Sequence, residues 1–245
     1  PVYCQMFGAK HYPLELKVKN YDYYKELQKK IKKIKPKLVA IANPNQPIEA
    51  MLSLKQIKNI CKLAERFGSL VIIDEAYYHF NNVTAQSLIK SCQNLIVVRT
   101  FSKAFGVAGM RIGYTISNKK IIGYMLSIKP IYEINAFNMK LVRILIKNIK
   151  VMKNYVKEVH KGRMILKKFL HKRHIEMIGK YSNTVLFKLE NKTKVDKVIK
   201  YLFKNKFIVR PMKIDNDDKY IRATLGSSKI MKKFTSKLKL ALELK

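Results

Sequence analysis

Two apolar patterns alternate along the first half of the chain. Short runs of consecutive apolar residues, rich in β-branched side chains, are typical of buried strands in a parallel sheet covered on both faces. These runs span residues 37–42, 70–73 and 95–98. Between them, apolar residues recur every three or four positions, which predicts amphipathic helices. The predicted helices cover residues 23–34 and 53–67. Alternating strands and helices predict an α/β fold with a mostly parallel sheet.

The second half of the chain begins with a predicted strand after residue 111 and a short helix over residues 119–126. Helical spacing from Leu141 to Val159 then predicts one long helix over residues 137–170. Beyond this helix the pattern indicates a smaller α+β unit. Its predicted strands cover residues 184–189, 207–209 and 220–224, and its predicted helices cover residues 194–204 and the C-terminal segment from Ser227 or Ser228.

One segment, residues 100–111 (TFSKAFGVAGMR), combines residue types that carry chemistry. Lys103 follows a buried strand, where poor hydration favours the neutral, nucleophilic form of an amine. The hydroxyls of Thr100 and Ser102 and the guanidinium of Arg111 can hold a phosphate dianion beside that amine. A nucleophilic lysine next to a phosphate site is what a Schiff base with pyridoxal phosphate requires.

This segment resembles the lysine loop of fold-type I aminotransferases, in particular their histidinol-phosphate aminotransferase branch. The resemblance implies that Lys103 forms a Schiff base with pyridoxal 5′-phosphate and shuttles protons. It also implies that Thr100, Ser102 and Arg111 bind the cofactor phosphate. The fold it implies is a three-layer large domain with a mostly parallel sheet, here residues 1–155, and a small α+β C-terminal domain, here residues 156–245.

A carboxylate ends the predicted strand over residues 70–73. Ligands of open α/β sheets bind at the carboxyl ends of strands, so Asp74 stands where function is expected. The resemblance implies that Asp74 pairs with the protonated pyridine nitrogen, and that Tyr77 bonds the phenolic oxygen of the cofactor. With Lys103, these two residues form the predicted catalytic set.

The turn over residues 43–49 (NPNQPIE) resembles the asparagine-rich turn of the family but departs from it. Gln46 aligns with the asparagine that bonds the cofactor's phenolic oxygen, so it is a predicted cofactor ligand with one additional methylene. Ile48 and Glu49 replace the threonine and glycine that follow. At the start of the chain, the resemblance implies that Tyr3, in a Pro-x-aromatic segment, stacks on the pyridine ring.

Two arginines are predicted to bind substrate. Arg222 lies in a segment that resembles the family's carboxylate-binding motif, and Arg210 lies in one that meets a substrate phosphate in the histidinol-phosphate branch. The resemblance further implies a homodimer acting on an amino donor and a 2-oxo acid. It places the family's second phosphate support, its N-terminal arm and a tyrosine that reaches the neighbouring subunit upstream of Pro1.

The charge and the cysteine content bear on the binding partners and the cellular location expected for this chain. The chain has 51 basic and 16 acidic residues, a net charge of +35, which would attract polyanions. The lysines are spread over nearly every segment, so nucleic acid is not the expected partner. Cys4, Cys61 and Cys92 are widely spaced and odd in number, which indicates a reducing compartment, with the cytoplasm as the expected location. No apolar run is long enough to span a bilayer, and no metal site is predicted.

Two other functions remain open on the sequence, and a third is weighed and set aside. Decarboxylation of phosphothreonine or phosphoserine would use the same cofactor and the same residues. An impaired remnant that binds polyanions through its charge would use none of them. A strand ending in Asp-Glu-Ala, here residues 74–76, is also typical of nucleotide hydrolases, but the phosphate-binding G-x-x-x-x-G-K-[ST] loop that those enzymes need is absent from these residues.

Overall fold

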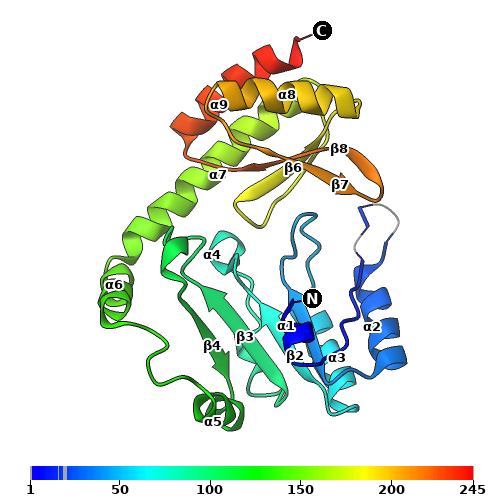
Figure 1. Cartoon of the computed structure of the whole chain (residues 1–245), viewed down its shortest axis with the longest axis vertical. Helices are drawn as coiled ribbons and strands as arrows, with labels where there is room; N and C mark the ends of the chain where they lie inside the picture. The colour runs from blue at the N-terminus through cyan, green and yellow to red at the C-terminus, as the bar shows by residue number, and fades with distance from the viewer. Residues whose placement is uncertain (1, 16, 19–20, 245) are drawn as a thin grey trace.

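The computed structural model describes residues 2–15, 17–18 and 21–244 and has two lobes (Figure 1). The chain passes from the N-terminal lobe to the C-terminal lobe along α7 (Ile149–His171). Pro1, the first residue of the Pro-x-aromatic segment, lies outside the described residues.

The sheet of the N-terminal lobe has the strand order β1-β2-β3-β4. The first three strands are parallel and β4 is antiparallel to β3, which confirms the predicted α/β fold with a mostly parallel sheet. The strands are β1 (Leu38–Ala42), β2 (Leu70–Asp74), β3 (Leu95–Thr100) and β4 (Gly113–Ser117). Parallel pairing aligns the carboxyl ends of β1, β2 and β3 at one edge of the sheet.

Helices α2 (Tyr23–Ile34) and α3 (Leu54–Glu65) cover one face of this sheet, as their spacing predicted. The capping box forms: Gln56 N–H donates to the Ser53 hydroxyl at 3.3 Å, and Ser53 N–H donates to the Gln56 side chain at 2.9 Å. The opposite face is partly open, with Leu38 51% and Leu70 38% exposed. The expectation that these strands are covered on both faces is therefore wrong at this end of the sheet.

Among its described residues, this lobe also has four short helical segments. They are α1 (Val2–Met6), α4 (Tyr78–Asn81) and the 3₁₀ turns η1 (Gln86–Leu88) and η2 (Ala108–Met110). Each spans five residues or fewer, which is too short for a periodic pattern to predict.

The predicted helix over residues 137–170 is two helices, α6 (Ala136–Lys147) and α7 (Ile149–His171), so that prediction is wrong. Asn148 separates them with φ −104° and ψ 37°, and its side-chain amide donates to the Ile144 carbonyl at 2.9 Å. Asparagine side chains compete for backbone groups in this way, which interrupts a helix that apolar spacing alone would continue. Neither α6 nor the preceding α5 (Lys119–Ser127) has a buried residue.

The sheet of the C-terminal lobe is antiparallel, in the order β5-β6-β8-β7. Its elements are β5 (Met177–Ile178), β6 (Thr184–Lys188), α8 (Lys192–Lys204), β7 (Arg210–Ile214), β8 (Asp217–Thr224) and α9 (Ser228–Leu242). The predicted strand over residues 207–209 is wrong. Lys206 has the left-handed φ of 65°, and Phe207 N–H donates to the Leu202 carbonyl at 2.9 Å. These residues form the turn that ends α8, so the strand begins only at Arg210.

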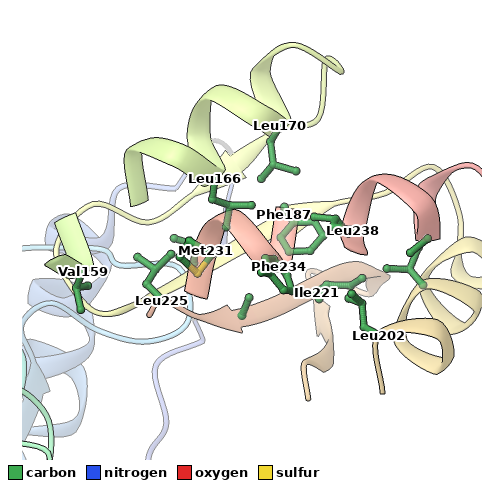
Figure 2. Close-up of a cluster of buried hydrophobic side chains, with 14 of the residues drawn as sticks. Val159, Leu166, Leu170, Phe187, Leu202, Ile221, Leu225, Met231, Phe234 and Leu238 are labelled. Carbon is green, nitrogen blue, oxygen red and sulfur yellow. The ribbon is translucent and has the colours of Figure 1, made fainter. Parts of the chain in front are cut away.

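The main core of the C-terminal lobe lies between its sheet and the helices α7, α8 and α9 (Figure 2). Phe187 and Ile221 on the strands, Leu166 on α7 and Leu238 on α9 are fully buried there. The cluster also includes Phe80 and Ala104 of the N-terminal lobe, which pack with the first turns of α7. The predicted domain boundary at residue 155 falls inside α7, a helix that contacts both lobes.

The described residues contain no helix with the length and apolar character needed to cross a membrane.

A glycine on α7 sets how closely α9 approaches. A Cβ added at Gly162 would lie 2.4 Å from the Gly226 carbonyl oxygen and 2.8 Å from Met231 Cγ. We expect Gly162→Ala to lower the free energy of unfolding by about 1–3 kcal/mol, because the added methyl overpacks the helix contact. Gly123→Ala is the control, since nothing lies within 4 Å of its Cβ position; there we expect a gain of up to about 1 kcal/mol from helix propensity. Urea unfolding of both variants measures the difference, and equal stabilities would contradict the packing argument.

Candidate active site

The candidate site lies at the edge of the N-terminal sheet where β2 and β3 end and β4 begins. Asp74, the last residue of β2, pairs in register with Val98, and Thr100, the last residue of β3, pairs with Gly113. The lysine loop, residues 101–111, connects β3 to β4 at this same edge. The fold thus brings Asp74 and the lysine loop to the carboxyl ends of adjacent parallel strands, where α/β sheets bind ligands.

Asp74 and Tyr77 are held by the turn that follows β2. Asp74 is exposed, and its Oδ1 accepts a hydrogen bond from Ala76 N–H at 2.9 Å. Tyr77 immediately precedes α4, and its ring centroid lies 5.4 Å from Nζ of Lys103. This cation–π contact joins the turn after β2 to the lysine loop after β3.

Hydrogen bonds and left-handed residues shape the lysine loop. The Thr100 hydroxyl accepts from Ser102 N–H at 3.0 Å and donates to the Ile112 carbonyl at 3.3 Å, which closes the loop at its base. Gly106 has φ 72°, a conformation that glycine adopts without strain. Arg111 has φ 50° and is exposed, with one guanidinium nitrogen donating to the Ala108 carbonyl at 3.3 Å.

Aromatic packing fixes the part of the loop that carries Lys103. Phe101 is buried, and its ring centroid lies 4.8 Å from that of Phe105 and 5.7 Å from that of Tyr114. Phe105 also meets His79 edge to face, with a centroid distance of 5.2 Å. Ala104 is buried in the core shared with α7. Lys103 is therefore flanked on both sides by anchored residues.

The free polar atoms at this edge fit the cofactor that the resemblance implies. Within the part of the chain that the structure describes, Lys103 Nζ, Asp74 Oδ2, Tyr77 Oη and Ser102 Oγ have no hydrogen-bond partner in the protein. An amine, a carboxylate and two hydroxyls are suited to an aldehyde, a pyridinium nitrogen, a phenolic oxygen and a phosphate, respectively. The donor set therefore suits pyridoxal phosphate.

Gln46 and Tyr3 do not join this group in the structure. The Gln46 amide accepts a hydrogen bond from the Thr184 hydroxyl at 2.6 Å and donates to Glu49 at 3.3 Å, so it is engaged with the C-terminal lobe. Tyr3 lies on the short helix α1 with 76% of its surface exposed. Their predicted contacts with the cofactor stay predictions.

Arg210 and Arg222 lie side by side on the C-terminal sheet, because they are register partners on β7 and β8. Ile221 and Ala223 point into the helix-covered core, so alternation puts both arginines on the opposite face. That face also carries Leu186 and Tyr220, which cluster with Ile48 of the N-terminal lobe. The two arginines therefore lie on the sheet face that turns toward the N-terminal lobe (Figure 1).

A buried ion pair behind the site was missed from the sequence. Arg99 Nε donates to Glu75 at 3.0 Å, with side-chain exposures of 8% and 1%, and the guanidinium carbon lies 3.7 Å above the ring of Tyr78. Burial opposes the charge, but hydrogen bonds to Tyr114 and Glu75 hold the pKa of Arg99 above its usual value. The sequence did contain a signal for this pair, because Glu75 and Arg99 are charged residues that follow runs of apolar strand residues. The pair anchors the turn that carries Asp74 and Tyr77.

His79 beside this pair favours its neutral form. Burial, followed by the nearby positive charge of Arg99, lowers the pKa of its imidazole. Among the described residues there is no group of three metal-ligating side chains, so these contacts give no metal site.

The family model for aminotransferase class I and II matches residues 3–238 of this chain. A histidinol-phosphate aminotransferase of Thermoanaerobacter pseudethanolicus is 33% identical over 229 residues, which cover 92% of this chain and 63% of the relative. The chain thus spans less than two thirds of that relative's length.

Solved structures of similar fold cover nearly the whole chain. The histidinol-phosphate aminotransferase of Sinorhizobium meliloti in complex with pyridoxal-5′-phosphate has a TM-score of 0.85 at 16% identity, covering 98% of this chain and 66% of that one. The histidinol-phosphate aminotransferase of Clostridium acetobutylicum has a TM-score of 0.82 at 26% identity, covering 99% and 75%. These likenesses confirm the predicted fold class.

Removing one partner of the buried ion pair tests its role. We expect Glu75→Ala to lower the free energy of unfolding by about 3–5 kcal/mol, because Arg99 would be left buried without a counter-charge. The exposed pair of Lys129 and Glu133 provides the control; we expect Glu133→Ala to cost less than about 1 kcal/mol. Chemical denaturation of both variants measures the two values. A loss at Glu75 no larger than at Glu133 would show that the pair does not anchor the turn.

Proposed function

Because this chain belongs to the class I and II aminotransferase family, we propose that it is a pyridoxal-phosphate-dependent aminotransferase acting on amino acids or phosphorylated amines. The observation that carries the proposal is the sheet edge that Asp74 and Lys103 share, because Asp74 ends β2 and Lys103 follows the adjacent parallel strand β3. An amine and a carboxylate at one ligand-binding edge are the two groups that this chemistry needs most.

Each site residue has a role in this proposal. Lys103 would hold the cofactor. Once the substrate amine has displaced Nζ of Lys103, that free amine would take a proton from the α-carbon of the substrate. When bound, pyridoxal phosphate supplies a ring that withdraws electrons from that carbon. Asp74 keeps the ring nitrogen protonated, and Tyr77 donates a hydrogen bond to the phenolic oxygen. The phosphate ligands are Thr100, Ser102 and Arg111.

Two further cofactor contacts belong to the proposal. Tyr3 stacks on the pyridine ring, and Gln46 supports the phenolic oxygen. In the structure the Gln46 side-chain oxygen accepts from Thr184 and one N–H donates to Glu49, which leaves its second N–H for the phenolic oxygen.

The substrate class follows from the arginines. Arg222 pairs with a carboxylate in bidentate geometry, and Arg210 binds a phosphate. Their pairing on adjacent strands, together with the name of the curated relatives, supports a phosphorylated amine as amino donor and a 2-oxo acid as acceptor. We also propose a cytoplasmic homodimer. The exposed apolar side chains of α5 and α6 support the dimer.

Borohydride reduction tests the position of the cofactor. With a stoichiometric amount of pyridoxal phosphate, we expect reduction followed by peptide mass spectrometry to find the pyridoxyl group on Lys103, and Lys103→Ala to lose this adduct. The control is Lys90→Ala, an exposed lysine outside the site, which should keep the adduct on Lys103. Adducts scattered over surface lysines, with no preference for residue 103, would refute the proposal.

One assay separates the other two functions. An aminotransferase transfers the amino group of the donor to a 2-oxo acid, which yields a new 2-oxo acid and a new amino acid. A phospho-amino-acid decarboxylase, using the same active-site lysine, instead breaks the bond between the substrate's α-carbon and its carboxylate and releases CO₂. Both activities should disappear in Lys103→Ala. A remnant that binds polyanions would instead bind nucleic acid with a steep salt dependence that Lys103→Ala leaves unchanged.

A further inference from the structure

One buried carboxylate that the proposed chemistry does not use joins the two lobes. Glu49, in the loop between β1 and α3, is only 6% exposed and has φ 56°. Its carboxylate accepts hydrogen bonds from the backbone N–H groups of Lys180, Tyr181 (2.6 Å) and Ser182 (3.0 Å), and from the Ser182 hydroxyl. Successive N–H groups that point at one anion form a binding nest. Here the anion comes from the other lobe.

The nest is also held from behind. Arg163 of α7, 7% exposed, donates to the carbonyls of Gly179 (2.8 Å) and Ser182. Burial lowers the pKa of Arg163, and the negative charge of Glu49 partly offsets this shift. The turn over residues 179–182 therefore lies between a carboxylate of one lobe and a guanidinium of the other. Both charged side chains are largely buried, so each depends on the hydrogen bonds that the turn between them provides.

The contact between Glu49 and residues 180–182 lies between the two parts of the proposed site, the substrate arginine Arg222 and the cofactor carboxylate Asp74. Thr184, two residues after Ser182, pairs with Thr224, and Leu186 pairs with Arg222. On the other side, the loop of Glu49 starts at Asn43, whose N–H donates to the carbonyl of Asp74 at 2.9 Å. Hydrogen-bonded strands thus connect the turn to the substrate arginine, and the loop to the cofactor carboxylate.

The backbone at Glu49 indicates that its position is imposed by contacts. A non-glycine residue other than asparagine or aspartate rarely adopts a left-handed conformation, and such strain persists only where the surroundings enforce it. The four donors of residues 180–182 provide that enforcement.

We propose that Glu49 is a positioning residue that latches the loop between β1 and α3 to the 180–182 turn and so sets the distance between the cofactor edge and Arg222. The latch itself is independent of the proposed function. Its effect on substrate binding rests on that function.

Hydrogen–deuterium exchange tests the latch in the chain without cofactor. We expect the amides of residues 180–182 to exchange at least about tenfold faster in Glu49→Gln and Glu49→Gly than in the unaltered chain, because each loses a charge-assisted hydrogen bond. Glu65→Gln, which changes an exposed carboxylate on α3, is the control and should leave these amides protected. Protected amides in the core of α7 and α9 would confirm that each variant is folded.

Glu49→Gly also permits chemical rescue. Glycine relieves the left-handed backbone and leaves the nest empty, so added formate should restore protection of residues 180–182, whereas chloride at equal ionic strength should not. Unchanged exchange in Glu49→Gly would overturn the latch, and so would loss of protection spread over the whole C-terminal lobe.

Kinetics with bound cofactor test the positioning. We expect Glu49→Gln to raise KM for the carboxylate substrate several-fold and to leave the adduct on Lys103 intact. An unchanged KM would refute the positioning of Arg222, while absence of any adduct in the unaltered chain would refute the proposed function and leave the exchange result to decide the latch.

Discussion

The register between β2 and β3 is the constraint on which the candidate site depends. Parallel pairing places Asp74 opposite Val98, so the carboxylate and the loop that begins after Thr100 leave the sheet at one edge. Slipping either strand by one residue would turn its buried side chains to the opposite face. The apolar strand residues that pack against α2 and α3 therefore set the register, and the register sets where Asp74 and the lysine loop lie.

The sequence predicts the parts of the fold that depend on local patterns of residue type. The strands over residues 70–73 and 95–98, helix α2 and the Ser53 capping box follow from spacing and side-chain type, and the structure has all of them. The Lys103 loop was readable because hydroxyls, small residues and an arginine stand at fixed offsets from one lysine. Residue type and short spacing are enough where the contacts are local.

Contacts between distant residues could not be predicted in the same way. Gln46 and Glu49 bind groups more than 130 positions away in the chain, and the Arg99–Glu75 pair joins β3 to the turn after β2. No local pattern in the sequence reveals either set of contacts. The break at Asn148 and the late start of β7 depend on single hydrogen bonds that override apolar spacing. Tyr3 shows the same limit, because a residue's type does not say which surface its helix packs against.

The uncovered apolar surface has a consequence for how the chain behaves in solution. Side chains such as Ile131 and Tyr132, near α5 and α6, are about nine-tenths exposed, and would draw copies of the chain together. The net charge of +35 drives the same copies apart, but this repulsion weakens as the Debye length shortens. Ionic strength therefore shifts the balance between these two effects, and added salt favours contact between the exposed apolar side chains.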